Sequence, residues 1–109
     1  MQPFEVVVVP FPYSDRLAEK RRPALVVSHP DLPDLTGKVW VAMITSSAGA
    51  LIGDVPISDI AAAGLPVTST LRASKIATLD ADRILRKLGK LSPTDEALAR
   101  AALSACAGF

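Results

Sequence analysis

Four consecutive valines at residues 6–9 constrain the fold of this chain more than any other feature. Because β-branched side chains favour an extended backbone, the run predicts a short, largely buried strand over residues 5–10. Pro10 and Pro12 end it, since neither can donate a backbone N–H to a neighbouring strand. The chain therefore opens with a short strand bounded by prolines.

Similar short apolar segments recur further along the chain. They predict strands at residues 23–28, 39–45 and 55–57, and two short strands or one bent strand over residues 69–79. Residues 29–38 carry turn chemistry, with two prolines, two aspartates and a glycine. Neither face of 39–45 is polar, so we expect one face to meet the core and the other a partner subunit.

Two helices are expected after these strands. A short one begins at Asp80 and keeps its leucine and isoleucine side chains on one side as far as Leu88. The second follows Ser92, which reads as an N-cap before Pro93, and runs to about Gly108. Short strands, tight turns and a C-terminal helix predict a mainly β fold, a small, strongly curved sheet or barrel.

Length and composition favour one compact domain over residues 1–109. Half of the residues are apolar and 21% are charged, which is typical of a soluble globular protein. The apolar runs are far shorter than the ~20 residues that span a bilayer, and no signal-like segment stands at the amino terminus. We therefore expect a cytoplasmic protein, in which the single Cys106 is a small core residue.

Charge is unevenly distributed along the chain, although the net charge is only +1. Cations gather in residues 15–22 and 72–90, whereas acidic residues prevail in residues 31–59. Folding would turn this pattern into a basic face and an acidic face, unless it is simply an ordinary solvated surface.

The sequence contains few of the residue patterns that bind metals or nucleotides. One histidine, one cysteine and scattered aspartates offer no zinc-ligand spacing and no paired acidic site for magnesium, so no metal and no cofactor are expected. Neither GxGxxG nor GxxxxGK[ST] is present. His29 lies in a proline-rich turn and is expected to face solvent.

An arginine and a hydroxyl remain as candidates for chemistry. Pro23 restricts Arg22 to extended conformations and so directs its side chain reproducibly. Thr45 ends an apolar strand and is followed by Ser46. A guanidinium beside a hydroxyl can hold a phosphate and stabilise charge on phosphorus without a metal. Taken singly, a solvated strand-end arginine and a threonine bound to backbone remain open readings.

Four segments in order resemble the MazF/PemK/Kid family of toxin endoribonucleases from bacterial toxin–antitoxin pairs. They read VVVVPFPYSD, RRPALVVS, MITSS and STLRASKIATLD. The resemblance implies an SH3-like barrel of the CcdB/PemK type, working as a homodimer that cleaves single-stranded RNA without metal. It further implies attack of a ribose 2′-OH on the adjacent phosphate, with Arg22 and Thr45 as the catalytic residues.

Two departures from the family pattern accompany this resemblance. Some relatives carry an Arg-x-Asp pair; the arginine corresponds to Arg72, an RNA-binding candidate, but Ser74 stands in place of the aspartate. The family usually has Gly-Asp before its first strand, where this chain reads Pro-Phe-Glu, so that Glu5 keeps the acidic group and the glycine is lost.

The loop before the second strand corresponds to one that covers RNA and responds to the antitoxin in relatives. It offers Tyr13 as a base-stacking platform and Arg16, Lys20 and Arg21 as phosphate contacts, and Ser46 joins these RNA-binding candidates. A disordered, acidic antitoxin tail is the expected second ligand of the same groove.

Two other functions fit the same fold. One is a non-enzymatic toxin of the CcdB type, which binds DNA gyrase through its C-terminal helix. The other is a family member that has lost catalysis and serves as an interaction module, an alternative that Ser74 keeps open. Arg22 before proline and Thr45 favour the nuclease.

Overall fold

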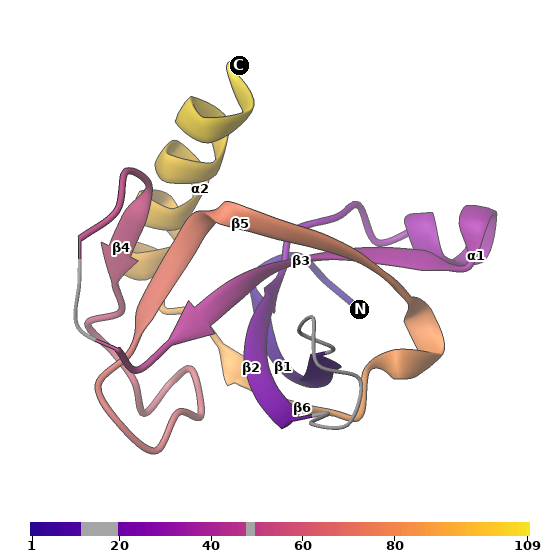
Figure 1. The fold of residues 1–109 in the computed structure, drawn as a ribbon, viewed down its shortest axis with the longest axis horizontal. Coiled ribbons are helices and arrows are strands. Elements are labelled where there is room, and N and C mark those ends of the chain that lie inside the picture. Colours follow the sequence, from indigo (N-terminus) through magenta and orange to yellow (C-terminus); the bar gives the residue numbers. More distant parts are fainter. Residues whose placement is uncertain (12–19, 48–49) are drawn as a thin grey trace.

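The structure is a computed structural model that describes residues 1–11, 20–47 and 50–109. Within these ranges six strands form one antiparallel sheet in the order β4-β5-β3-β2-β1-β6. The strands are β1 (Glu5–Phe11), β2 (Lys20–Val26), β3 (Lys38–Thr45), β4 (Asp54–Pro56), β5 (Thr70–Asp80) and β6 (Arg86–Lys90). Figure 1 shows the long β5 arching over β1 and β2, so that the sheet curls into a half-barrel. The predicted strongly curved, mainly β fold is confirmed.

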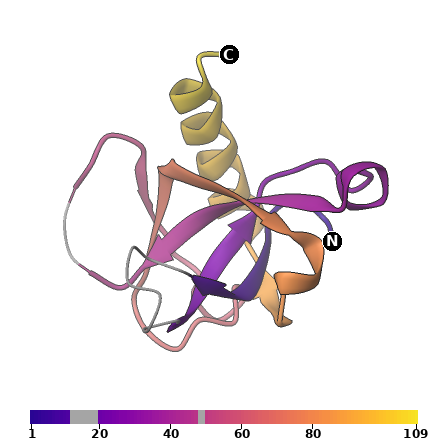
Figure 2. The same cartoon turned by 45° about the vertical axis from the view of Figure 1, so that its right-hand side comes forward.

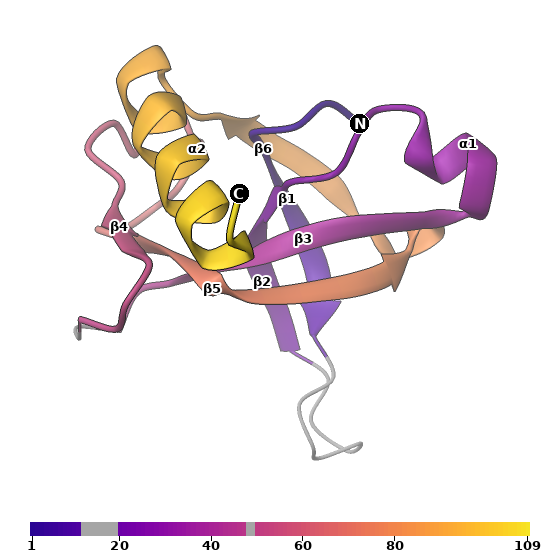
Figure 3. The same cartoon turned by 90° about the horizontal axis from the view of Figure 1, so that it is seen from above.

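The predicted C-terminal helix is α2 (Pro93–Ala107), which packs against β5 and β4. The Ser92 hydroxyl accepts the Asp95 N–H at 3.2 Å, as expected of an N-cap. The helix ends at Gly108, whose φ of 85° lies in the left-handed region that glycine occupies freely. Figures 2 and 3 show α2 on one side of the sheet, away from the short α1 (Leu32–Thr36).

The apolar core has two parts on opposite faces of the sheet. In β3, Ala42 and Ile44 face a cluster completed by residues of α2 and the 57–65 segment. Val39, Val41 and Met43 face a second cluster with β1, β2 and the end of β5, across the inside of the curl. Because successive side chains of a strand alternate, these clusters identify the face to which each nearby polar residue belongs.

The expectation of a helix from Asp80 to Leu88 is wrong. The chain forms one turn of 3₁₀ helix, η1 (Ala81–Arg83), and then the strand β6. β6 pairs with β1, and the Leu85 N–H donates to the Val8 carbonyl at 2.9 Å. The edge of β1 needs a partner for its backbone groups, and this requirement prevails over the helical spacing of the apolar side chains.

Four further expectations need correction or refinement. β2 begins at Lys20, before the predicted start at Pro23, and the predicted turn at 29–38 includes α1. β5 is a single bent strand, because residues 73–75 have no counterpart on β3 between Ala42 and Met43. Cys106 is exposed, whereas a core position was expected. His29 is exposed, as predicted.

The segment before β1 compensates for the missing glycine. Phe4 has a φ of 69°, which side-chain-bearing residues seldom adopt, yet it is buried and its N–H donates to Val26 at 2.7 Å. Its ring also lies 4.8 Å from the Arg100 guanidinium. Packing of the Phe4 ring thus offsets the backbone strain. Glu5 accepts a contact from Lys87 at 2.6 Å, and this partner lowers the pKa of Glu5.

Candidate functional site

The register of the sheet brings the predicted catalytic residues to one face. The β2–β3 ladder ends with Ala24 opposite Met43. Continued by two residues, the same register sets Arg22 opposite Thr45, on the face that Ala24 and Met43 share. Arg22 and Thr45 therefore lie at one end of the half-barrel, on the face that turns into the curl.

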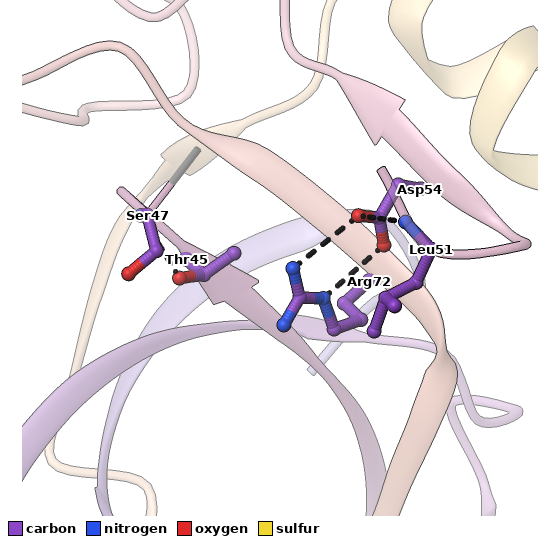
Figure 4. A network of polar contacts seen from close by, with 5 residues as sticks. All are labelled: Thr45, Ser47, Leu51, Asp54 and Arg72. Carbon is purple, nitrogen blue, oxygen red and sulfur yellow. Dashed lines mark hydrogen bonds and ion pairs between the residues drawn. The ribbon is translucent and has the colours of Figure 1, made fainter. Parts of the chain in front are cut away.

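Thr45 is the last residue of β3 and is half-buried. Its Oγ1 accepts the Ser47 N–H at 3.1 Å, and both side chains are drawn in Figure 4. Accepting this bond leaves the hydroxyl proton available, because a threonine hydroxyl donates one hydrogen bond and accepts up to two. Thr45 is thus an oriented donor at the end of the strand.

Arg22 lies inside β2 and is half-buried, and its Nε atom is buried. It pairs with Val9 of β1 on one side and precedes Pro23, which holds its backbone extended. A guanidinium anchored in this way presents its outer nitrogens in a narrow range of directions. Together with an oriented hydroxyl, it can bind an oxyanion such as a phosphodiester.

Arg72 forms the best-defined ion pair of this region, with Asp54 of β4. Arg72 Nε donates to Asp54 Oδ1 at 3.2 Å and Nη2 to Oδ2 at 3.3 Å. The Asp54 side chain is only 6% exposed and that of Arg72 21%. Asp54 also accepts the Leu51 N–H at 3.0 Å, and this bond, followed by Arg72, lowers the pKa of the carboxyl despite its partial burial.

The register also relates this ion pair to Thr45. Thr45 pairs with Thr70 on β5, and Arg72 pairs with Met43, two residues earlier on β3. Arg72 is therefore a diagonal neighbour of Thr45 on the same face, a spacing that long side chains can bridge. Figure 4 shows the Arg72 guanidinium between Asp54 and Thr45.

A groove of about 580 Å³ opens at the start of β2, and Arg21, Arg22 and Ser46 are among the residues that line it. Its other walls come from residues 64–67 and from Leu85, Arg86 and Leu88 near β6 and are largely apolar. Arg21 points to the opposite face from Arg22, since neighbouring residues of a strand alternate. The groove thus combines cations at its rim with an apolar wall.

The remaining predicted residues are distributed around this end of the sheet. Lys20 is exposed at the start of β2, opposite Phe11. Tyr13 and Arg16 lie outside the residues that the structure describes. Ser74 is exposed on β5 and is part of the irregular stretch that bends this strand.

Sequence reasoning missed two charged residues of this region, Asp54 and Arg86. Asp54 is separated from Arg72 by 18 residues, and only the pairing of β4 with β5 brings them together. Arg86 was assigned to a helix, so its position beside the groove could not be inferred. The one available signal for Asp54 was Gly53, whose φ of 90° forms the turn that sets β4 against β5.

No group of three histidine, cysteine, aspartate or glutamate side chains suited to a metal ion occurs among residues 1–11, 20–47 and 50–109. In the same part of the chain, no helix is both long and apolar enough to cross a bilayer.

A second, mainly apolar groove of about 1110 Å³ lies between the C-terminal end of α2 and the outer side of β3 and β5. Its exposed apolar residues include Trp40, Ile52, Ile76 and Phe109, and Cys106 also lines it. Trp40 lies on the outer side of β3, which explains why neither face of residues 39–45 is polar in the sequence. Apolar side chains gathered at the surface in this way are often found at protein–protein contacts.

Comparison with known proteins identifies a family whose sequence model matches this chain. The sequence model for PemK-like, MazF-like toxins of type II toxin–antitoxin systems matches residues 2–106. No curated protein matches the chain in sequence.

Solved structures similar to this fold include MazF from Deinococcus radiodurans, which is 25% identical, with a TM-score of 0.78 over 100% of this chain and 97% of the other. A MazE–MazF complex from the same organism is 23% identical, with a TM-score of 0.80 and the same coverage. A mycobacterial endoribonuclease in complex with its cognate antitoxin is 23% identical, with a TM-score of 0.78 over 98% and 94% of the two chains.

Proposed function

Because the chain belongs to the family of PemK-like, MazF-like toxins of type II toxin–antitoxin systems, we propose that it is an endoribonuclease that cleaves single-stranded RNA without a metal ion. Cleavage of cytoplasmic mRNA would stop translation and growth. The observation that supports this proposal is the β2–β3 register: its last pair, Ala24 and Met43, lies two residues from Arg22 and from Thr45, so that continuing the ladder would set these two residues opposite each other. A mycobacterial protein of the same fold is described as an endoribonuclease.

The proposed reaction is an attack of the ribose 2′-OH on the adjacent phosphate. The O2′–P bond forms as the 2′-OH loses its proton to solvent water, and the P–O5′ bond breaks as the 5′-oxygen takes up a proton, which leaves a 2′,3′-cyclic phosphate and a 5′-OH. Arg22 neutralises the extra charge of the phosphorane or delivers a proton to the departing 5′-oxygen. Thr45 donates a hydrogen bond from its hydroxyl to a non-bridging oxygen. Both roles use the hydrogen-bond donors that a guanidinium and a hydroxyl carry.

Neither Ser74 nor Asp54 acts as the general base in this scheme. A serine hydroxyl is far too weak a base to replace the aspartate found at this position in some relatives. Asp54 is bound to Arg72 and to the Leu51 N–H, and the resulting low pKa makes it a poor proton acceptor.

RNA would follow the cations at the start of β2. Lys20 and Arg21 are exposed there, and Ser46 shares the 580 Å³ groove with Arg21. We assign these residues, with Tyr13, Arg16 and Arg72, to RNA binding, where guanidinium groups meet phosphates and Tyr13 stacks on a base.

The second proposed ligand is a cognate antitoxin with an acidic, disordered tail. Relatives of the same fold are described as complexes with antitoxin, in one case MazE. The basic rim and apolar wall of the 580 Å³ groove suit a peptide that alternates acidic and apolar side chains. Antitoxin and RNA would then compete for the same cations.

We also propose that the chain works as a homodimer. The 1110 Å³ groove leaves Trp40, Ile52 and Ile76 exposed to water, and a second copy of the chain would cover them. Dimerisation would bring two sets of basic residues into one assembly.

The nuclease assignment is tested by incubating the purified protein with a long single-stranded RNA in excess EDTA. Specific cleavage is expected, and the antitoxin should suppress it. RNA that stays intact at micromolar protein would contradict the proposal. If the same sample inhibited DNA supercoiling by gyrase, a CcdB-type toxin would replace it.

A further inference from the structure

Asp54 binds Arg72 through two hydrogen bonds and is itself bound by a backbone N–H. Asp54 follows Gly53, whose φ of 90° turns the chain so that the Asp54 carboxylate accepts the Leu51 N–H at 3.0 Å. The same carboxylate receives two N–H groups of Arg72, at 3.2 and 3.3 Å. With 6% of its side chain exposed, Asp54 is fixed from two sides.

This contact leaves the outer part of the Arg72 guanidinium with a defined direction. A guanidinium is planar and carries five N–H groups, of which Asp54 engages one on Nε and one on Nη2. The other three remain in the same plane and point away from the carboxylate. Figure 4 shows this outer side of Arg72 turned toward Thr45. Asp54 therefore decides where the remaining donors lie.

The position of those donors matches the place of the candidate phosphate. Arg72 is the diagonal neighbour of Thr45 across the β3–β5 ladder, on the face that also carries Arg22. Side chains in this relation can meet a common ligand between them. A phosphodiester bound by the Thr45 hydroxyl would be within reach of the outer nitrogens of Arg72.

We propose that Asp54 is a positioning residue that fixes the Arg72 guanidinium so that its outer N–H groups bind a non-bridging oxygen of the phosphodiester at Thr45. The inference rests on the proposed nuclease function of this site. It assigns Asp54 an indirect part in cleavage, through Arg72, and gives Arg72 a defined contact with the reacting phosphate.

Positioning of Arg72 by Asp54 can be distinguished from simple attraction of RNA, because the Asp54–Arg72 pair has no net charge. Asp54 cancels the charge of Arg72, so the pair adds little to long-range binding of a polyanion. A fixed hydrogen bond that strengthens as charge develops on the phosphate instead raises the rate of the chemical step. Loss of Asp54 should therefore lower kcat more than it changes KM.

The kinetic test uses Asp54→Asn, which keeps the shape of the side chain, together with Arg72→Ala and the double variant. Asp54→Asn should lower kcat at least about ten-fold with KM nearly unchanged. In the Arg72→Ala background the same substitution should have no further effect, because its target is gone. Arg72→Lys, which keeps the charge but cannot form the two-pronged contact, should resemble Asp54→Asn. Asp34→Asn on α1 is the matched control and should be neutral.

A kcat that rises in Asp54→Asn would overturn the inference, because Asp54 would then merely offset a useful charge. An equal fall in kcat in the Arg72→Ala background would overturn it as well.

A second measurement does not depend on activity. The Arg72 Nε–H resonance of ¹⁵N-labelled protein should be sharp and slow to exchange in the wild type and broadened in Asp54→Asn, at equal thermal stability. An unchanged resonance would contradict the positioning role even if RNA is cleaved. If the wild type cleaves no RNA while the resonance responds as expected, the proposed function fails and the orientation of Arg72 by Asp54 stands.

Discussion

Arg21 and Arg22 are adjacent in sequence, but their side chains leave β2 on opposite faces. Arg22 shares its face with Thr45, so Arg22→Ala should lower kcat for RNA cleavage at least about 100-fold, the usual loss for one charge-stabilising donor. Arg21→Ala should mainly raise KM and reduce the salt dependence of binding, since it removes a phosphate contact. Measuring kcat and KM of both variants at two salt concentrations tests this difference. A similar fall of kcat in both variants would contradict the assignment by face.

Asp95 stabilises the fold, and this stabilisation is lost at low pH. It is 1% exposed and accepts N–H bonds from Ser58 and Asp59, at 3.1 and 2.9 Å, and the Ser58 hydroxyl at 2.7 Å. Burial raises the pKa of Asp95, but these bonds outweigh it and the net pKa is lowered. Asp95→Ala should cost about 2–4 kcal/mol of unfolding free energy, since it leaves buried donors without an acceptor.

The sign of the pH dependence follows from the lowered pKa. The stabilisation by Asp95 is complete above its unfolded pKa of about 3.9 and disappears as the pH falls through the lower folded value. Urea unfolding of the wild type and of Asp95→Asn at a series of pH values should show a shallower acid loss in the variant. Identical acid slopes would mean that Asp95 is not a source of this dependence.

At the residue scale, the sequence predicted the side chains whose position depends on their neighbours along the chain. Arg22 was found because Pro23 follows it, and Ser92 because Pro93 does. Asp54 was missed because its partner Arg72 is 18 residues away, and only the β4–β5 register joins them. Cys106 was placed in the core from its helix alone, but it is exposed and lines the apolar groove beside β3 and β5.

The elements of the fold were predicted where apolar runs were short and bounded by prolines or glycines. The strands at β1, β2 and β3 and the helix α2 belong to this group. β6 was not predicted, because the apolar residues 84, 85 and 88 have helical spacing. Nothing in the local sequence shows that β1 needs a partner strand at its edge. The motifs of the first three strands and β5 correctly indicated the toxin family.

Gly89 is the residue that lets β6 lie against the turn at residues 60–64. A Cβ added to Gly89 would lie 2.4 Å from the Ala62 carbonyl oxygen. Gly89→Ala should therefore cost about 2–3 kcal/mol. It should also speed hydrogen exchange of the Lys90 N–H, which donates to Ala62 at 3.1 Å.

Gly37→Ala is the control for this substitution. Gly37 has a φ of 73°, and no neighbouring atom lies within 4 Å of an added Cβ. Gly37→Ala should therefore lower the free energy of unfolding by only about 1 kcal/mol, through backbone strain. The amides of β6 should stay protected in that variant. Equal costs with undisturbed β6 amides in both variants would contradict close packing at Gly89.

For the whole molecule, the apolar groove beside α2 makes dimerisation testable by a single charge. Ile76→Asp places a carboxylate in this groove and should raise the dissociation constant of the dimer at least about 100-fold. Leu35→Asp on α1 is the control, because Leu35 is also exposed to water but lies outside the groove. Light scattering across a concentration series gives both constants. A wild type that stays monomeric at high concentration would contradict the shared interface.

The central claim is that this half-barrel cleaves RNA through the ribose 2′-OH, with Arg22 and Thr45 and without metal. The most direct measurement uses a defined RNA oligonucleotide in excess EDTA, with its products identified by mass spectrometry. A twin substrate carries a single 2′-deoxy nucleotide at the cleaved position. We expect 2′,3′-cyclic phosphate and 5′-OH ends from the first substrate and an intact second substrate. Cleavage of the deoxy-substituted twin, or products with 5′-phosphate ends, would contradict the account.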